Sequence, residues 1–261
     1  MKHILIDYAV LANNILNAET QYKSNKVIIS ALFNDISSND FESVVKNRIT
    51  IIDSYYSTQM NKRLYGIDEL ANNLAKYSDD TLKLEAKKYL NNPKAEGVIK
   101  KLFAKEYGID KSGKPFGKAI SLISKYLFFL NDYKFPIYDS LALISYKLLQ
   151  NGNYIKNNQS INENNFYNLI KELNIDSNIN NYEKLDNLLW LIGKLSKGSF
   201  AILMTKHKYE SLIEVLIEQL QNVKSKQKDN IIRQYIISTY SSSTLFSENQ
   251  KIFFEFVFSL K

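Results

Sequence analysis

Asp139 and Lys118 are the residues of this sequence best suited to covalent chemistry, and they stand 21 positions apart. Asp139 belongs to the run Pro-Ile-Tyr-Asp-Ser, which begins at Pro136 and precedes an apolar helical pattern. A carboxylate held there could stabilise positive charge that develops during a reaction or activate a water molecule. The amine of Lys118 could attack an electrophilic carbon if its surroundings lowered its pKa. Together they are candidates for a site of general acid–base and nucleophilic chemistry.

Both residues also suit simpler roles, which the sequence leaves open. Asp and Ser are favoured at helix N-caps, so Asp139 and the following Ser140 could only start a helix. Lys118 could be one more lysine of a solvated surface.

Two adjacent tyrosines and a nearby glutamine, Tyr55, Tyr56 and Gln59, form a second group. Aromatic rings stack on nucleobases, and an amide can read the hydrogen-bonding edge of a base. We therefore expect these three residues to line a pocket for a base. The alternative is that they pack between helices.

A turn containing two glycines, Ser112–Gly117, separates two helical patterns immediately before Lys118. Two helices joined by such a turn can present backbone N–H groups to a phosphate. We expect DNA contacts in this region from Gly113, Lys114, Gly117, Lys125 and Ser140.

The net charge of +7 is concentrated in one segment of the chain. Residues 83–125 hold 11 Lys against four acidic residues, and the rest of the sequence sums to zero. Such a segment favours binding to a polyanion, because neutralising phosphates releases their counterions. A solvated lysine-rich surface is the alternative.

Several classes of protein are excluded by composition. There is no cysteine, which excludes disulfides, thiolate catalysis and cysteine-based metal sites. The two histidines, His3 and His207, are far apart in sequence. No run of 18 apolar residues predicts a membrane span, and the first 20 residues lack a secretory signal pattern. We therefore expect a cytoplasmic protein that needs no metal or cofactor.

Apolar residues recur at helical spacing along most of the chain, so we expect an all-α fold. Pro93, Pro115 and Pro136 mark breaks between patterns, and 151–165 is expected to be an exposed loop. The predicted helices cover about 3–17, 26–34, 41–57, 67–75, 80–90, 95–106, 120–130, 139–150, 163–172, 182–196, 206–224, 228–240 and 247–259.

We predict a main helical domain over 1–204 and a helical C-terminal extension over 205–261. In the extension, the apolar run 251–258 is expected to dock onto the protein's own core. Trp190, which lies in a strongly apolar run, is also expected in the core.

The segment around residues 45–150 resembles the helix-hairpin-helix DNA glycosylase superfamily, to which endonuclease III and the 8-oxoguanine glycosylases belong. Gly117–Ala119 is similar to the end of the family's glycine-rich hairpin, and Ile137–Ser140 to its catalytic Asp motif. Upstream, Ser57–Gln59 followed by Gly66–Ala71 is similar to the segment whose Gln reaches the lesion.

This resemblance implies a two-lobed helical fold that binds double-stranded DNA and excises a flipped, damaged base. Asp139 would be catalytic, and Lys118 would be the nucleophile of a weak lyase activity. Two alternatives remain. One is an inactive helix-hairpin-helix DNA-binding module, because Leu141–Leu143 stands where the family often has a basic residue. The other is an all-helical protein-interaction domain.

Overall fold

The computed structural model describes residues 2–18, 20–34, 40–221 and 223–260, and these residues contain no β-strand. Their α-helices are α1 (Lys2–Ala18), α2 (Thr20–Asn34), α3 (Phe41–Tyr56), α4 (Gly66–Leu74), α5 (Asp79–Asn91), α6 (Val98–Ala104), α7 (Ile120–Leu130), α8 (Ser140–Asn151), α9 (Phe166–Asp176), α10 (Tyr182–Ser196), α11 (Lys206–Val215), α12 (Ile217–Leu220), α13 (Ser225–Thr239) and α14 (Glu248–Ser259). Two 3-10 helices, η1 (Met60–Lys62) and η2 (Phe200–Leu203), complete the set. The predicted all-α class is confirmed, and none of these helices is long and apolar enough to cross a membrane.

The helical patterns seen in the sequence fall on these helices, with ends that differ by a few residues. The segment predicted over 206–224 is divided into α11 and α12. Local chemistry explains where a helix begins. The Ser78 hydroxyl, for example, accepts the Thr81 N–H at 3.2 Å, which satisfies one free donor at the start of α5.

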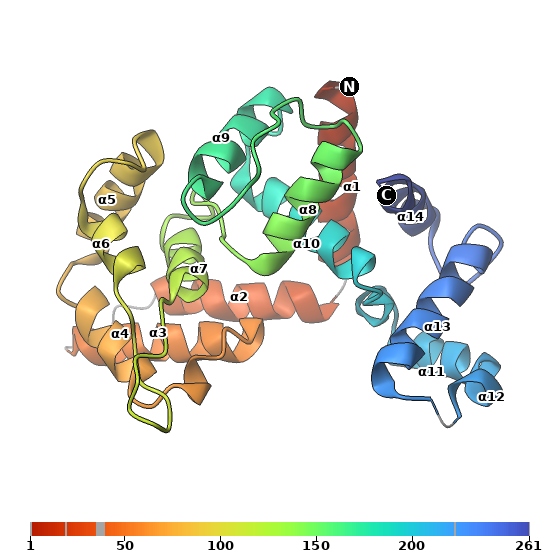
Figure 1. The fold of residues 1–261 in the computed structure, drawn as a ribbon, viewed down its shortest axis with the longest axis horizontal. Helices are drawn as coiled ribbons and strands as arrows, with labels where there is room; N and C mark the ends of the chain where they lie inside the picture. Colours follow the sequence, from red (N-terminus) through yellow and green to blue (C-terminus); the bar gives the residue numbers. More distant parts are fainter. Residues whose placement is uncertain (1, 19, 35–39, 222, 261) are drawn as a thin grey trace.

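The helices form two groups that face each other (Figure 1). In the first, α3 packs against α2, α4 and α7, while α5 packs against α6 and α7. In the second, α10 packs between α1 and α8. Helices α1 and α2 contact each other across the two groups, and so do α5 and α9. This arrangement brings residues distant in sequence to the space between the groups.

Helix α7 is the central element of the first group. It contacts α2, α3, α5 and α6, and all its residues from Leu122 to Leu130 are buried. The apolar stripe predicted for this helix is therefore correct. Lys125 was expected to contact DNA, but its side chain is only 3% exposed.

The connection between α6 and α7, residues 105–119, differs from the short interhelical turn that we expected. Its two arms pair as a hairpin. The Tyr107 N–H donates to the Gly117 carbonyl at 3.1 Å, and the Phe116 N–H donates to the Gly108 carbonyl at 2.9 Å. The glycine-bearing turn is therefore the end of a projecting hairpin rather than a tight link between helices.

A second segment fixes this hairpin. Leu64 and Ile109 exchange two backbone hydrogen bonds of 3.0 and 3.1 Å. The Arg63 guanidinium donates to the carbonyl of Gly117 at 2.8 Å and to that of Lys118 at 3.1 Å. The residues that follow η1 and the hairpin consequently form one unit.

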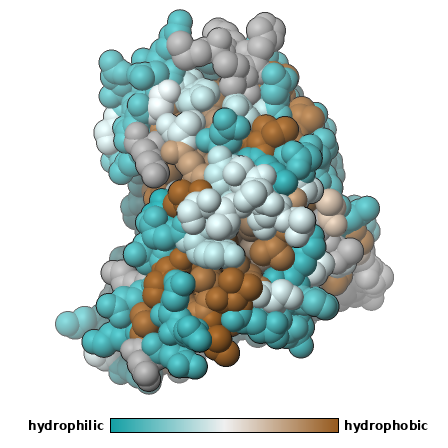
Figure 2. Space-filling view, turned by 90° about the vertical axis from the view of Figure 1, so that its right-hand side faces the viewer, coloured by the Kyte–Doolittle hydropathy of each residue, from teal (hydrophilic) through white to brown (hydrophobic). Residues whose placement is uncertain are grey.

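In the C-terminal part, α14 packs against α1 and α10. The rings of Phe256 and Tyr8 stack with centroids 3.7 Å apart, and Phe253 and Phe254 are fully buried. The predicted docking of this helix on the protein's own core is confirmed. Beside it, α11, α12 and α13 pack on one another, and apolar side chains gather on the lower half of the face in Figure 2. The proposed boundary at residues 204 and 205 stays a prediction.

Candidate functional site

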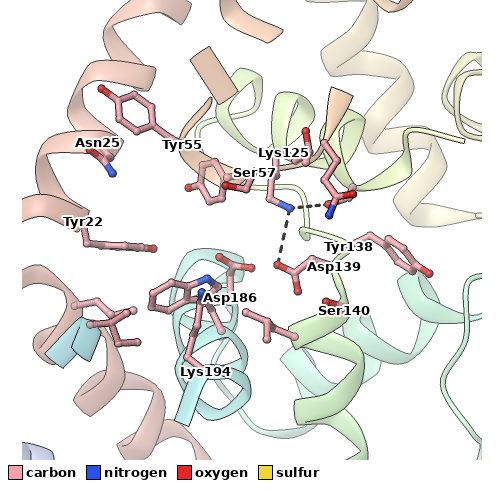
Figure 3. Close-up of a pocket in the computed structure, with 18 residues that line it drawn as sticks. Tyr22, Asn25, Tyr55, Ser57, Lys125, Tyr138, Asp139, Ser140, Asp186 and Lys194 are labelled. Carbon is pink, nitrogen blue, oxygen red and sulfur yellow. Dashed lines mark hydrogen bonds and ion pairs between the residues drawn. The ribbon is translucent and has the colours of Figure 1, made fainter. Parts of the chain in front are cut away.

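A cavity of about 570 Å³ opens between the two groups of helices. Its walls come from α2, the end of α3 and the loop after it, α7, the start of α8, and α10. Figure 3 shows how Tyr22, Lys125, Asp139 and Asp186 point into it from four different helical elements. The volume lies in the range of sites that hold small molecules or a single nucleotide.

Lys125 is the buried amine of this cavity. Its Nζ lies 3.8 Å from Asp139 Oδ2 and donates a hydrogen bond of 2.8 Å to the Ser121 hydroxyl (Figure 3). The same amine lies 5.4 Å from the centre of the Tyr56 ring. Burial lowers the pKa of Lys125, and the charges of Asp139 and Asp186 offset part of that effect. A lowered pKa increases the fraction of neutral, nucleophilic amine.

Asp139 is both the N-cap of α8 and a wall of the cavity. Its Oδ1 accepts the Ala142 N–H at 2.8 Å, while Oδ2 faces the Lys125 amine. The structural role as an N-cap therefore does not exclude a chemical role, because the cap uses only Oδ1. Ser140, expected to contact DNA, lies beside it on the exposed rim of the cavity.

Asp186, from α10, brings a second carboxylate to the cavity. Burial, and after it the nearby charge of Asp139, raise its pKa to about 7, while Lys125 acts in the opposite direction. A carboxyl group with this pKa exchanges its proton near neutral pH, so it can donate or accept a hydrogen bond.

Aromatic side chains cover the remaining walls. The rings of Tyr22 and Trp190 lie 5.7 Å apart at 42°, and the Lys194 amine lies 5.3 Å from the Trp190 ring. Tyr56 lines the cavity near Lys125, and Tyr55 lines its rim with 40% of its surface exposed. Trp190, which was expected in the core, packs against the core and is partly exposed where it borders the cavity.

The loop from Ser57 to Gln59 forms another part of the wall. Gln59 has a φ of 65°, a left-handed conformation that is uncommon for residues other than glycine. The buried Asp53 carboxylate holds this loop by accepting the Thr58 hydroxyl at 2.5 Å and the Met60 N–H at 3.0 Å. The structure thus brings the three predicted base-pocket residues, Tyr55, Tyr56 and Gln59, to one cavity with Asp139.

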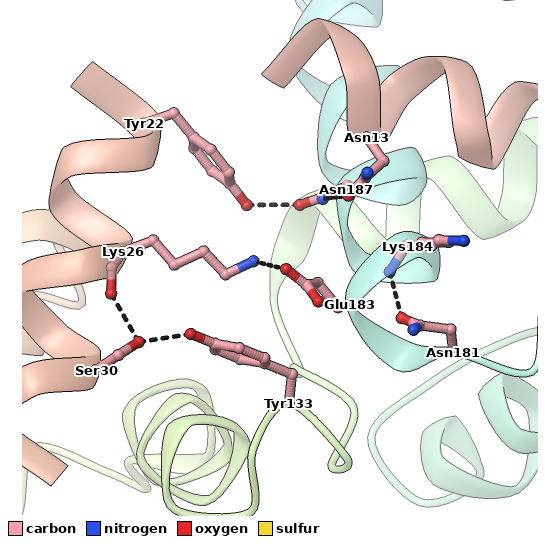
Figure 4. A network of polar contacts seen from close by, with 9 residues as sticks. All are labelled: Asn13, Tyr22, Lys26, Ser30, Tyr133, Asn181, Glu183, Lys184 and Asn187. Carbon is pink, nitrogen blue, oxygen red and sulfur yellow. Dashed lines mark hydrogen bonds and ion pairs between the residues drawn. The ribbon is translucent and has the colours of Figure 1, made fainter. Parts of the chain in front are cut away.

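Polar contacts between α2 and α10 keep two walls of the cavity together (Figure 4). The Tyr22 hydroxyl donates to Asn187 Oδ1 at 2.5 Å, and the Asn187 amide donates to Asn13 on α1 at 3.0 Å. Lys26 forms an ion pair with Glu183, one turn after Tyr22 in α2 and one turn before Asn187 in α10. Because these side chains are at least half buried, the contacts define the spacing of the two helices.

Lys118 does not reach the cavity. Its amine forms a 2.6 Å ion pair with Glu163, and both side chains are more than 40% exposed. The geometry therefore gives no support to Lys118 as the nucleophile. Lys125, the amine expected on a DNA-facing surface, is the buried one of the two.

The hairpin turn also differs from the expected phosphate site. Asp110 Oδ1 accepts the N–H groups of Ser112 and Lys114 at 2.7 and 3.0 Å, and the Asp110 carbonyl accepts the Gly113 N–H at 3.0 Å. These amides are therefore already used within the turn. A phosphate bound at Gly113 and Lys114 would contact the Lys114 side chain rather than these backbone amides. The carbonyl of Gly117 accepts a hydrogen bond from the Arg63 guanidinium.

Sequence reasoning missed Asp186, Trp190 and Tyr22. A signal for the first two was present, because an acidic residue in the apolar run of α10 stands four positions before the tryptophan. That spacing places both on one face of a helix. Within the described residues, no three His, Asp or Glu side chains converge as metal ligands.

No protein-family model, curated protein or solved structure matches the chain. The described residues form an all-helical fold, and its cavity brings together one amine, two carboxylates and several aromatic side chains.

Proposed function

We propose that this protein is a DNA glycosylase with lyase activity, built on a two-lobed helix-hairpin-helix glycosylase fold, and that Lys125 is its nucleophile. The observation that carries the proposal is the buried Lys125 amine, 3.8 Å from the Asp139 carboxylate in the wall of a nucleotide-sized cavity. A partly desolvated amine beside a fixed carboxylate is the arrangement expected for Schiff-base chemistry at a sugar carbon.

The rest of the cavity supports a flipped nucleotide as the substrate. A base removed from the duplex needs aromatic stacking and hydrogen-bonding groups along its edge. Tyr22, Tyr56 and Trp190 offer rings, and Gln59 and Asp186 offer polar groups. The surplus of lysines in residues 83–125 supports DNA as the partner, since all but Lys125 keep exposed or partly exposed side chains.

In the proposed reaction, the neutral Lys125 amine forms a bond to C1′ while the C1′–N bond to the base breaks. The electron pair of that bond leaves with the base, which takes a proton from Asp186. Asp139 accepts a proton from the new ammonium group and returns it to O4′ as the sugar ring opens to the imine. The regenerated Asp139 carboxylate then takes a C2′ proton, and a C2′–C3′ double bond forms as the C3′–O bond breaks. The 3′ phosphate leaves with the electron pair of that bond, which nicks the strand.

Borohydride trapping on duplexes that contain 8-oxoguanine, uracil or alkylated purines tests this proposal. The wild-type protein should form a covalent complex with at least one of these duplexes, because borohydride reduces the imine to a stable amine. Lys125→Gln should form none. Lys118→Gln is the matched control, since it removes an exposed lysine of the same segment, and it should trap like the wild type.

Trapping that survives in Lys125→Gln would exclude Lys125 as the nucleophile. Glycosidic cleavage without trapping, detected as strand breaks after alkali, would leave a glycosylase that uses water instead. The non-catalytic DNA-binding alternative predicts salt-sensitive duplex binding with neither trapping nor cleavage. A protein-interaction domain predicts no such binding.

A further inference from the structure

A second hollow, which we call the side pocket, lies next to the cavity. Its volume is about 360 Å³, at the lower end of the range of sites that hold small molecules. Its walls are the face of α2 between Lys23 and Asn34, Tyr133 in the loop between α7 and α8, and Glu183 at the start of α10. The side pocket is open to solvent, because Val27 on its wall is 60% exposed.

Side chains of α2 form the partition between the cavity and the side pocket (Figure 4). Tyr22, Lys26 and Ser30 follow one another at intervals of four residues, so they lie on one face of the helix. Tyr22 lines the cavity, whereas Lys26 and Ser30 line the side pocket. The path from one space to the other therefore runs along this face of α2, past Lys26.

The partition is one side chain thick at Lys26. Its amine lies 6.0 Å from the centre of the Tyr22 ring, which is a wall of the cavity. The same amine lies 4.5 Å from the centre of the Tyr133 ring, which is a wall of the side pocket. The ion pair between Lys26 and Glu183 closes the gap between α2 and α10. Because lysine has a flexible four-carbon stem, rotation of this one side chain would open the partition.

The proposed reaction leaves the excised base on the cavity side of the partition. Once the imine has formed, the sugar is bound to Lys125, and the DNA strand lies over the exposed rim at Ser140. The base then lies beside Asp186, its proposed proton donor, three positions after Glu183 in α10. Its own DNA blocks the way back to the rim, whereas only Lys26 and Glu183 separate it from the side pocket.

The side pocket offers the contacts that a free nucleobase needs. The Tyr133 ring can stack on a base. The Ser30 hydroxyl and the Asn34 amide can form hydrogen bonds with its edge. Val27 and Ala31 contribute apolar surface. A neutral heterocycle that passes Lys26 would therefore exchange one aromatic and polar environment for another before it reaches solvent.

We propose that the side pocket is the exit for the excised base, which leaves the cavity past Lys26 while the sugar is still bound to Lys125. The inference rests on the proposed function for its substrate. It adds a second, transient binding site for a free nucleobase, and release by this route leaves the covalent DNA intermediate undisturbed.

Retention of a radiolabelled base by the covalent complex tests this inference. The duplex that the wild type traps most strongly is prepared with the label in its target base. Borohydride then fixes the sugar to Lys125, so the DNA continues to cover the rim while the base is followed. Gel filtration at successive times separates label that remains with the protein from label that has been released.

Two substitutions should fill the side pocket without reaching the cavity. Ala31→Trp and Val27→Trp each place an indole at an exposed position of its wall. They are made separately, so that one reports if the other fails to fold. The matched control is Ser24→Trp, an exposed position of α2 that lines neither the cavity nor the side pocket.

The wild type and Ser24→Trp should release the base from the trapped complex at the same rate. Ala31→Trp and Val27→Trp should be trapped as well as the wild type, but they should release the base about tenfold more slowly. Lys26→Ala should release it faster than the wild type, because the partition then lacks the side chain that closes it.

Base release by both filled variants at the wild-type rate would overturn the inference and leave the glycosylase proposal intact. A wild-type complex that keeps its base throughout would do the same. Equal slowing in Ser24→Trp would also overturn it, because the effect would then belong to added bulk on α2. Failure of the wild type to trap any of the duplexes overturns both proposals.

Discussion

The Lys125 amine and the Asp139 carboxylate lie 3.8 Å apart, although one comes from the middle of α7 and the other from the N-cap of α8. One oxygen of the carboxylate accepts a hydrogen bond from the Ala142 N–H in the first turn of α8. The amine has the Ser121 hydroxyl, Asp139 and the Tyr56 ring as neighbours. The proposed chemistry depends on this pair, and each member can be changed separately.

Lys125→Met should remove activity without loss of stability. Methionine fills a similar volume and has no amine to desolvate, and the N-terminus of α8 still compensates the charge of Asp139. We expect the free energy of unfolding to stay within about 1 kcal/mol of the wild type or to rise. Base excision should fall at least about a thousandfold. Urea denaturation and single-turnover excision measure the two quantities. A loss of about 3 kcal/mol would instead mark Lys125 as an essential structural partner of Asp139.

Two substitutions of Asp139 should distinguish its structural role as the N-cap of α8 from its proposed catalytic role. Asn is as good an N-cap as Asp, so Asp139→Asn should keep the stability of α8, whereas Asp139→Ala should cost about 1 kcal/mol. Both should abolish trapping, because neither carries a carboxylate beside Lys125. Thermal or urea unfolding gives the first comparison and borohydride trapping the second. Full activity of Asp139→Asn would remove the carboxylate from the mechanism.

Asp186 should make stability fall as the pH rises towards 7. Its folded-state pKa of about 7 lies above the ordinary value of 3.8, so between these values the folded state holds a proton that the unfolded state has lost. The folded state is therefore favoured at low pH and loses that advantage as the group ionises. Asp186→Asn should match the wild type near pH 4 and be more stable at pH 8, by on the order of 4 kcal/mol.

The same substitution also tests the proposed proton donor. Wild-type excision should decline as the pH rises through about 7, because Asp186 then loses the proton that the base requires. Asp186→Asn should be slower at low pH and lack this decline. A pH profile of excision under single-turnover conditions measures it, and an unchanged decline in the variant would assign it to another group.

Arg63→Ala should loosen the hairpin over residues 105–119. The guanidinium is the donor for the carbonyls of Gly117 and Lys118, and it covers one face of the Phe116 ring. Leaving these groups without their partner should cost about 1–3 kcal/mol. Amide hydrogen exchange should accelerate at Tyr107 and Phe116, whose N–H groups pair the two arms. Arg63→Lys should rescue little of this, since one ammonium cannot reproduce the fork of the guanidinium. Unchanged exchange rates would show that the backbone pairing alone holds the hairpin.

The sequence by itself determined the helical class and most helix positions, because apolar spacing records which residues share a face. It also brought Tyr55, Tyr56, Gln59 and Asp139 into one hypothesis, and the structure gathers them around one cavity. The docking of the apolar run at 251–258 was predictable for the same reason, since a continuous apolar segment has to be covered.

The tertiary structure alone decided which lysine is the buried one. Lys118 and Lys125 lie on the same polar side of the pattern leading into α7, and periodicity cannot say whether that side faces water or an internal cavity. Lys125 is the buried lysine because α2, α3 and α10 pack around it. Asp186, which lies beside it in the cavity, belongs to α10 and follows Lys125 by 61 positions in the sequence. Contacts between such distant segments are set by packing in three dimensions, which no local pattern encodes.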